Sequence, residues 1–491
     1  MNGTDGDDIL IGSLGVDELV GGLGDDRYYV LQHADVDVIE AIDGGYDRVR
    51  TTFNYTLAAG QGIEVLRAHP NAAGVTFVGN ELDNSLIGAA GDDTLFGGLG
   101  NDRLAGGLGA DILAGEAGND VYYVNDGSDQ VIEAVGGGYD VVYASADFTL
   151  AAGEEVEVLR AHPNAAAALR LTGNEFDNVL IGGAGDDFLD GGTGSDRISG
   201  GGGGDTITTS GASARIFAGD GDDTIRVDGS SASTGLVRGG DGVDTVRSAD
   251  LGQFEFRNVE ILDTYYGFVN ATARQIAAFE TYAADLAAAD AQISISLRGT
   301  GGTLDFTTGI GGLHSVEIRD VGLTSRIVVT GSINDDSLIG SLFNDTLRGG
   351  NGSDALSGGD GRDTLEGGAS DDRLNGGADN DRLTGGAGDD TFVFDAPIGG
   401  GINIDRIMDF TSDSDRIEID QEYYFPGLSI GQLVPIQFAQ GVATGTAPQL
   451  VYLQSEGALY FDSNGADDGG DTLFALLAGN PVLVSSDFWI V

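Results

Sequence analysis

A nine-residue repeat runs through this chain and constrains its fold more than any other feature of the sequence. Residues 349–384 read in nines as GGNGSDALS, GGDGRDTLE, GGASDDRLN and GGADNDRLT. Glycine fills places one and two, aspartate place six, and leucine place eight. A period of nine matches neither a helical turn nor simple strand alternation. It suits a short strand followed by a tight glycine loop, stacked on its neighbours.

The aspartate at place six keeps this register in four clusters of the chain. Its longest run extends unbroken from residue 336 to residue 390. Gly-Asp pairs also mark ordinary hairpin turns, but such turns do not hold a spacing of nine over consecutive copies. The aspartates in this phase are Asp8, Asp17, Asp26, Asp93, Asp102, Asp111, Asp120, Asp187, Asp196, Asp205, Asp223, Asp244, Asp336, Asp345, Asp354, Asp363, Asp372, Asp381 and Asp390.

The acidity of the chain makes compaction depend on a counter-charge. Asp and Glu number 79 against 23 basic residues, all of them Arg, for a net charge of −56. Such self-repulsion disfavours a compact state, and one large apolar residue in nine offsets little of the entropy lost on ordering. A hard cation held by carboxylate and carbonyl oxygens resolves both problems. Ca²⁺ suits such sites better than Mg²⁺, and a chain with no Cys and four His serves Zn²⁺ poorly.

Composition also argues against several classes of protein. Nucleic-acid binding needs clustered basic residues, so the acidity of the chain argues against nucleic acid as a partner. No apolar run reaches the roughly 18 residues of a membrane-spanning helix, so membrane insertion is not expected. Residues 1–6 lack the basic and apolar regions of a cleavable signal peptide, and we expect any export to use another route.

The units resemble the repeats-in-toxin (RTX) nonapeptide, G-G-x-G-x-D-x-U-x with U a large apolar residue, a calcium-binding repeat. The resemblance implies an all-β fold: an elongated right-handed parallel β-roll, or β-solenoid, with two nonapeptides per turn. It also implies Ca²⁺ ions between loops of adjacent turns, bound by the place-six carboxylates given above and by loop carbonyls. The implied glycine positions are Gly88, Gly97, Gly100, Gly106, Gly109, Gly182, Gly185, Gly191, Gly194, Gly349, Gly352, Gly358, Gly361, Gly367, Gly376, Gly385 and Gly388.

Several units depart from the pattern. Asn84 and Asn178 replace the aspartate at the starts of two clusters, and we expect divergent units to cap rolls or to bind weakly. The glycine at place four is replaced in the units that contain Leu82, Phe176, Ser370 and Asp379.

The repeats predict an alternation of calcium-binding clusters and spacers. We expect RTX clusters at 1–30, 79–124, 173–247 and 331–394, β spacers at 31–78 and 125–172, a divergent spacer at 248–330, and a C-terminal β-rich cap with a secretion signal at 395–491. The two β spacers are duplicates, because VLRAHPN at 65–71 recurs at 158–164. We expect each of them to extend the solenoid without a metal.

The divergent spacer and the tail carry weaker signals. Ile276, Phe279, Tyr282 and Leu286 have helix-like spacing within 272–289, whereas 316–319 and 327–330 look like strands. Asp409 is a candidate for a last carboxylate. The apolar end at 486–491 resembles the uncleaved signal read by type I secretion systems, and a closing strand packed on the core is the alternative interpretation.

No catalytic site is predicted. The sequence GLSIG at 427–431 matches G-x-S-x-G, but a nucleophile elbow needs a strand before it, a helix after it and a downstream His, and no His follows His314. HExxH is absent. His69 and His162 occupy equivalent places in the duplicated spacers, where we expect a shared turn hydrogen bond and not a zinc site or a general base.

These observations predict a secreted, non-enzymatic calcium-binding protein that folds on binding Ca²⁺ outside the cell or at its surface. A structural, surface-layer, matrix or adhesion role follows, with the type I secretion apparatus, cell-surface polysaccharide or a second copy as candidate partners. The alternative is the calcium-folded carrier portion of a secreted enzyme, such as a lyase, epimerase or lipase, whose catalytic part is divergent or missing.

Overall fold

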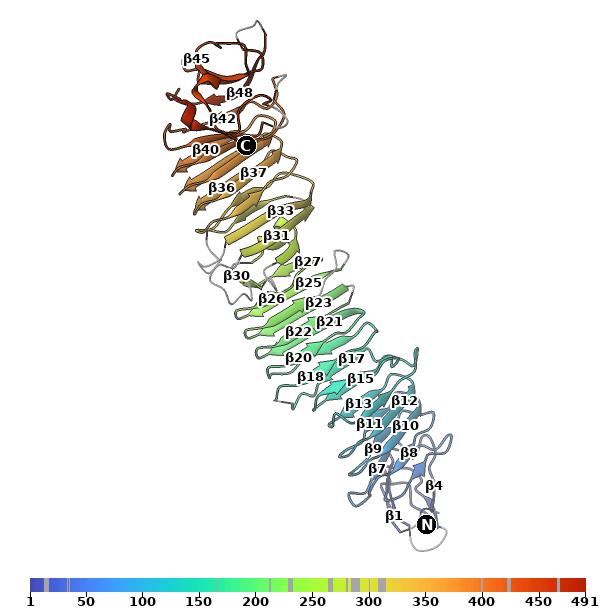
Figure 1. Cartoon of the computed structure of the whole chain (residues 1–491). Helices are drawn as coiled ribbons and strands as arrows, with labels where there is room; N and C mark the ends of the chain where they lie inside the picture. Colours follow the sequence, from blue (N-terminus) through green and yellow to red (C-terminus); the bar gives the residue numbers. More distant parts are fainter. Residues whose placement is uncertain are drawn as a thin grey trace. The chain divides into compact units, whose positions relative to one another are not determined.

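The computed structural model describes residues 1–12, 17–32, 34, 36–165, 167–211, 213–227, 233–263, 268–279, 281–283, 292–299, 301–307, 315–398, 401–421, 425–465 and 469–491. The chain forms two compact units: unit 1 comprises 1–246 and 253–258, and unit 2 comprises 247–252 and 259–491. Each unit is almost entirely β and is built from parallel strands that follow one another coil by coil (Figure 1). The all-β solenoid predicted from the repeat is therefore confirmed.

Each nonapeptide folds into a short strand and a glycine turn. In β37 (Ala355–Asp360), Leu356 at place eight is buried while its neighbours lie nearer the surface. The turn that follows uses φ values of 102° at Gly359 and 115° at Gly361, a region that side chains other than glycine enter only with strain. This conformation lets the chain reverse direction within a few residues.

Two nonapeptides make one coil. Leu347 pairs with Leu365, and Leu356 pairs with Leu374, so neighbouring strands of a sheet are two repeats apart in sequence. The place-eight side chains consequently stack in the interior, where Leu365 and Leu374 are completely buried. The core of the repeat clusters is thus a narrow file of single apolar residues.

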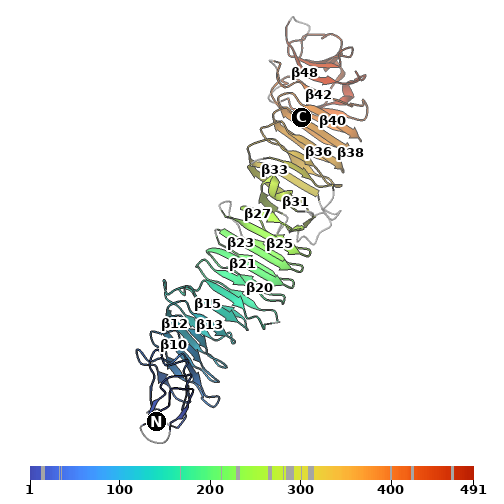
Figure 2. The same ribbon diagram turned by 180° about the vertical axis from the view of Figure 1, so that it is seen from behind.

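Unit 1 contains one long sheet and a set of shorter sheets, which are also seen from behind in Figure 2. The long sheet runs, in order, β1 (Ile9–Ile11), β3 (Arg27–Val30), β5 (Arg48–Thr51), β7 (Val65–Ala68), β9 (Ser85–Ile87), β11 (Arg103–Ala105), β13 (Val121–Val124), β15 (Val141–Ala144), β17 (Val158–Ala161), β19 (Val179–Ile181), β21 (Ser195–Gly202), β23 (Ser213–Asp220), β25 (Thr234–Asp241) and β27 (Gln253–Arg257). The shorter sheets contain β2 (Asp17–Val20) and β4 (Val36–Ile39); β6 (Tyr55–Thr56), β8 (Thr76–Val78), β10 (Thr94–Leu99), β12 (Ile112–Ala117) and β14 (Gln130–Ile132); and β16 (Phe148–Thr149), β18 (Arg170–Thr172), β20 (Phe188–Asp190), β22 (Thr206–Thr209), β24 (Thr224–Val227) and β26 (Thr245–Arg247).

Unit 2 has two long sheets and one strand pair. The first sheet runs β29 (Phe268–Ala271), β31 (Gln292–Gly299), β33 (Ser315–Leu323), β35 (Ser337–Ile339), β37, β39 (Arg373–Ala378), β41 (Thr391–Phe394), β43 (Arg416–Ile419), β49 (Phe488–Ile490) and β44 (Gly431–Gln432). The second runs β32 (Thr303–Asp305), β34 (Val328–Thr330), β36 (Thr346–Asn351), β38 (Thr364–Ala369), β40 (Arg382–Ala387), β42 (Asp405–Ile407), β48 (Asp471–Leu477), β47 (Ala458–Asp462), β46 (Gln449–Leu453) and β45 (Phe438–Gln440), and β28 (Ile261–Asp263) pairs with β30 (Thr281–Ala283).

The divergent spacer differs from its sequence expectation in one respect. The helix expected within 272–289 is a single turn, α1 (Ala273–Ile276), and β30 follows it. Ile276 and Phe279 are buried, as helix-like spacing requires. The residues that follow them form β30, which pairs with β28 and so ends the helix. Leu286 lies outside the described residues. The expected strands at 316–319 and 327–330 are present within β33 and as β34.

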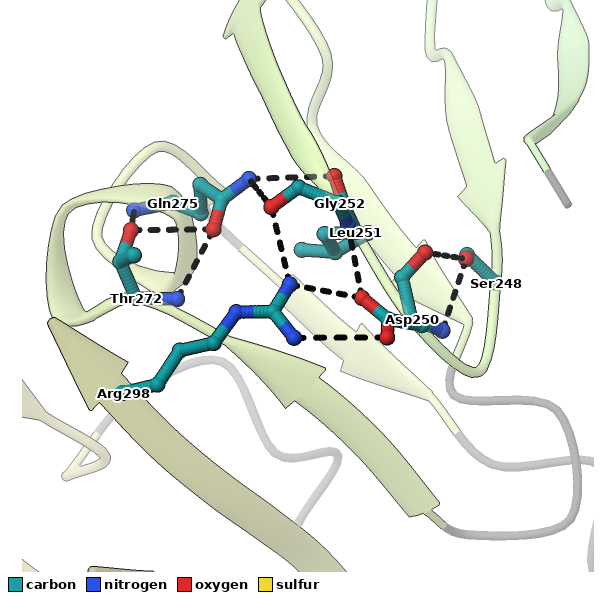
Figure 3. A network of polar contacts seen from close by, with 7 residues as sticks. All are labelled: Ser248, Asp250, Leu251, Gly252, Thr272, Gln275 and Arg298. Atoms are coloured by element: carbon teal, nitrogen blue, oxygen red, sulfur yellow. Dashed lines mark hydrogen bonds and ion pairs between the residues drawn. The ribbon is translucent and has the colours of Figure 1, made fainter. Parts of the chain in front are cut away.

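A polar network ties the start of unit 2 to α1 and β31 (Figure 3). Arg298 donates to the Asp250 carboxylate at 2.7 Å and to the Gly252 carbonyl at 2.9 Å. Gln275 donates to the Leu251 carbonyl at 3.1 Å and to the Gly252 carbonyl at 3.3 Å. These contacts join segments far apart in sequence, and they give the network a structural role.

The last coil of unit 2 is closed by antiparallel strands. Strand β46 pairs antiparallel with β47, and β47 with β48, which leaves a meander at the end of the second sheet. Strand β49 pairs parallel with β43, and its Phe488 and Ile490 are fully buried. The chain end therefore packs as a closing strand. Two short 3-10 helices, η2 (Pro435–Gln437) and η3 (Ser485–Asp487), precede β45 and β49. Within the described residues, no helix has the length and apolar character needed to cross a membrane.

Candidate metal centres

The place-six aspartates line the inside of the turns and are almost all buried. Among those whose side chains are described, only Asp8 is partly exposed, and each of the others is at most 3% exposed. Asp17 begins β2, but its side chain lies outside the described part. Burying so many carboxylates is costly unless each oxygen has a partner, so the partners of each oxygen decide what these positions can bind.

One oxygen of each carboxylate links neighbouring coils. The backbone N–H of Asp345 donates to Oδ1 of Asp363 at 2.7 Å, and the N–H of Asp363 donates to Oδ1 of Asp381 at 2.7 Å. The N–H of Asp354 donates in the same way to Asp372 at 2.8 Å. The place-six residues therefore form ladders in which each aspartate is held by the residue one coil earlier.

The second oxygen has no hydrogen-bond partner in the interior coils. A buried acceptor left unmatched costs free energy of folding, more so when it carries charge. The predicted aspartates whose Oδ2 is buried and without a hydrogen bond are Asp26, Asp102, Asp111, Asp120, Asp196, Asp205, Asp223, Asp354, Asp363, Asp372 and Asp381.

A backbone carbonyl of the next coil faces this free oxygen. A Cβ on Gly358 would stand 2.3 Å from Asp363 Oδ2 and 2.5 Å from the Gly376 carbonyl oxygen, and Gly367 has the same relation to Asp372 and Gly385 at 2.3 and 2.6 Å. Two acceptor oxygens converge there, and any side chain at place one would displace them. Carboxylate and carbonyl oxygens are the ligands that Ca²⁺ prefers, so the residues present fit a bound Ca²⁺ ion.

The first unit of each ladder satisfies its second oxygen internally. The N–H of the place-two residue donates to it: Ala89 to Asp93 at 2.8 Å and Ser341 to Asp345 at 2.6 Å. In interior units the place-two residue has a positive φ, as at Gly359 and even at Glu116. Its N–H then forms no hydrogen bond with the Oδ2 atom of the place-six aspartate. At the start of a ladder, a backbone N–H of the same unit therefore takes the place that a cation would occupy.

The asparagines at two cluster starts close their ladders in a related way. The side-chain amide of Asn84 donates to the Ile63 carbonyl at 2.9 Å, and that of Asn178 donates to the Val156 carbonyl at 2.8 Å. An amide N–H meets each carbonyl oxygen directly, so these units need no counter-charge. This geometry supports the expectation that they act as caps.

Five carboxylates outside the predicted set extend the ladders. Asp26, Asp111, Asp120, Asp381 and Asp390 donate their backbone N–H, at 2.7–3.1 Å, to carboxylates one coil later. Longer coils in the spacers and the cap break the spacing of nine at four of them, whereas Asp129 lies two repeats after Asp111. All five keep the pattern of an aspartate two residues before an apolar one. The acceptors are Asp47, Asp129, Asp140, Asp405 and Asp415.

Asp409 is not a ladder member. Its two carboxylate oxygens accept the N–H groups of Gly385 and Gly386 at 3.0 and 2.9 Å. The interpretation of Asp409 as the last carboxylate of the column is therefore wrong, because Asp405 and Asp415 occupy the two final positions.

The predicted glycines fall into two groups. Those at place one, such as Gly97 and Gly358, lie directly against the carboxylates. Those at place four, such as Gly100 and Gly361, lie against the backbone of the loop one coil earlier, at Leu82 and Phe343. At place four, Ser370 and Asp379 adopt φ values of 82° and 77°, so the loop keeps its shape even where glycine is replaced.

A triad of buried carboxylates lies where each duplicated spacer joins the cluster before it. Asp120, Glu133 and Asp140 bring ligand atoms within 4.8 Å of one another, and Asp26, Glu40 and Asp47 do the same. The Tyr122 hydroxyl donates to Glu133, and the Tyr28 hydroxyl to Glu40. Sequence reasoning missed both glutamates and predicted metal-free spacers, whereas this donor set suits a cation in each.

Burial perturbs the titration of the interior aspartates. Loss of hydration raises the pKa of Asp354 and of Asp372 to about 7 and that of Asp363 to about 8, with neighbouring carboxylates adding to the effect. Each value lies well above the ordinary Asp pKa of about 4. Without a cation, protons are therefore the only counter-charge these positions can take up.

Residues considered for catalysis have structural contacts instead. Nδ1 of His69 accepts the N–H of Asn71 at 3.2 Å, and His162 accepts that of Asn164 at the same distance, which confirms the expected shared turn bond. Ser429 is exposed in a loop, and its N–H donates to Gln437. No helix follows it before the short strand β44, and His314 lies outside the described residues.

Comparison with protein families supports the calcium assignment. The family model for the RTX calcium-binding nonapeptide repeat matches residues 1–30, 78–113, 96–131, 172–207, 210–230, 330–365 and 357–392. These segments carry the repeat-spaced aspartates of all four clusters except Asp244, and the repeats of this family bind Ca²⁺. No match was found among curated proteins.

We predict that the metal-free protein is more stable in acid than at neutral pH. The folded-state pKa values of Asp354, Asp363 and Asp372 are raised, so the folded chain holds protons that the unfolded chain releases. This contribution is complete below about pH 4 and is lost as the pH rises through 7 to 8. Circular dichroism in chelator should show β structure at pH 4 that disappears by pH 8. A metal-free fold that strengthens toward pH 8 would contradict the ladder.

We also predict that Asp363→Asn lowers the number of Ca²⁺ ions bound, because it removes a charge from an unpaired buried oxygen. The unfolding free energy in Ca²⁺ should fall by about 1–3 kcal/mol. Asp360→Asn is the matched control, since it removes the same charge from an exposed position of the same loop. Equilibrium dialysis and urea unfolding measure both effects. Equal ion counts for the two variants would rule out Asp363 as a ligand.

Proposed function

We propose that this chain, which carries RTX calcium-binding nonapeptide repeats, works outside the cell or at its surface as a structural, surface-layer, matrix or adhesion component whose fold is assembled by Ca²⁺. The observation that carries the proposal is the buried Oδ2 without a hydrogen-bond donor, repeated through both units. Such an interior disfavours the folded state until a cation is bound. Ca²⁺, when bound, supplies positive charge to the carboxylate and carbonyl oxygens.

The place-six aspartates of the interior coils are the proposed side-chain ligands, with the carbonyls of place-one glycines opposite them. Because binding and folding are coupled, the chain would remain unfolded where Ca²⁺ is scarce. An unfolded, highly acidic chain suits passage through a type I secretion apparatus. Outside the cell, Ca²⁺ in the millimolar range would then drive folding.

A non-enzymatic role is favoured by the contacts of the candidate catalytic residues. Ser429 has neither the strand-turn-helix setting nor the downstream His of a nucleophile elbow. The polar network of Asp250, Gln275 and Arg298 in the divergent spacer satisfies its own hydrogen bonds. Neither feature favours the alternative of a carrier portion of a secreted lyase, epimerase or lipase.

Folding should follow Ca²⁺ and not Mg²⁺. At pH 8 we expect circular dichroism to show a disordered chain in chelator and β structure after addition of Ca²⁺. Mg²⁺ at the same concentration should leave the chain disordered, because Mg²⁺ demands octahedral geometry and retains its water. Size-exclusion chromatography of the same samples should show compaction with Ca²⁺ alone. A compact metal-free protein at pH 8, or one restored by Mg²⁺, would refute the proposal.

A further inference from the structure

Four arginines line a groove on the outer face of unit 1. Arg27 on β3, Arg48 and Arg50 on β5, and Arg67 on β7 contribute to a groove of about 350 Å³. We call this feature the arginine groove. Its lining also includes Tyr29, Tyr46, Ser85 and Ile87.

The arginines of the groove face one another across neighbouring strands. Arg27 is paired in register with Arg48, and Arg50 with Arg67. Like charges directly opposite each other destabilise a sheet. Among the described residues, none of the four forms an ion pair with a carboxylate, although the chain has 79 acidic residues. The four guanidinium groups therefore lower the stability of the sheet by repelling one another, and no carboxylate of the described residues neutralises them.

The duplicated spacer shows that the fold does not need these arginines. Strand β13 pairs with β15, and β15 with β17, in the register used by β3, β5 and β7. The positions of Arg27, Arg48 and Arg50 are taken there by other side chains, and only the equivalent of Arg67 remains an arginine. The replacements are Val121, Val141 and Tyr143, with Arg160 as the retained arginine.

We propose that the arginine groove binds an anionic polysaccharide through its carboxylate or sulfate groups. Guanidinium groups bind such oxyanions with two parallel hydrogen bonds. The paired arginines stand on successive strands about 4.8 Å apart, so two guanidinium groups can bind the same carboxylate or sulfate group. The ring of Tyr46 lies under Arg48 at 4.9 Å and adds a flat apolar surface beside the cations.

The net charge of the protein favours a glycan over nucleic acid. A chain of net charge −56 repels a densely charged phosphate backbone over most of its surface. A polysaccharide with one charge per sugar or fewer meets less repulsion outside the groove. The inference deepens the adhesion role proposed above and gives it a partner of stated chemistry.

The test is binding of the full Ca²⁺-loaded protein to immobilised hyaluronan, with neutral dextran and duplex DNA as comparison surfaces. The variant Arg27→Val, Arg48→Val, Arg50→Tyr introduces the residues of the duplicated spacer. The control Arg326→Gln, Arg362→Gln, Arg406→Gln makes the same change in net charge at exposed arginines of unit 2. We expect the unmodified protein to bind hyaluronan in a saturable and salt-sensitive way. The affinity of the groove variant should be roughly tenfold or more weaker, and the affinity of the control should be unchanged.

Circular dichroism with Ca²⁺ separates loss of binding from loss of folding, and Arg67→Gln offers a milder second variant that should also weaken binding. If Ca²⁺ failed to fold the protein, the proposed function would be refuted, whereas the groove proposal is decided by the binding measurements. Equal binding by the groove variant, equal binding to dextran, or no binding to hyaluronan would overturn the groove proposal. Tighter binding to DNA than to hyaluronan would overturn it as well, in favour of a phosphate polymer.

Discussion

Among the described residues, most interior coils of the calcium-binding clusters hold a buried carboxylate that has a hydrogen-bond donor for only one of its two oxygens. The satisfied oxygen joins adjacent coils, as Asp363 does for the N–H of Asp345. The other oxygen faces a carbonyl, as at Gly376. The apolar file is one side chain wide per repeat, so little else offsets this cost. The free energy of folding consequently depends on the positive charge that binds between the carboxylate oxygen and the carbonyl oxygen.

The same constraint explains where the fold ends. Wherever a ladder begins, the place-two backbone N–H turns inward and takes the place of the counter-charge, as Ser341 does for Asp345. Asn84 reaches the same result with a side-chain amide. The spacers keep the ladder through Asp47 and Asp140 although their coils are longer than two nonapeptides. Carboxylate geometry, and not coil length, is what successive turns have in common.

The outer faces of the sheets are free of this constraint. The residues that point inward are alike in the two duplicated spacers. Val49 and Val142, for example, are both fully buried in equivalent strands. Their outward residues differ, with Arg48 in one copy and Val141 in the other. Outward positions can therefore vary in charge without altering the coil, so the surface can acquire binding properties independently of the interior that holds the fold together.

The sequence alone was sufficient to predict the local unit. Nine-residue spacing identified the inward leucines and the glycine turns, because each depends on residues within one repeat, and the resemblance to the RTX nonapeptide implied two repeats per coil and aspartate ligands between turns. Only the tertiary structure showed which Asp oxygens lack a donor, that Asp405 and not Asp409 continues a ladder, that Glu133 joins two aspartates, and that Arg27 lies opposite Arg48. Those relations join residues on different coils, and their register is set by how coils of unequal length stack, which no local pattern encodes.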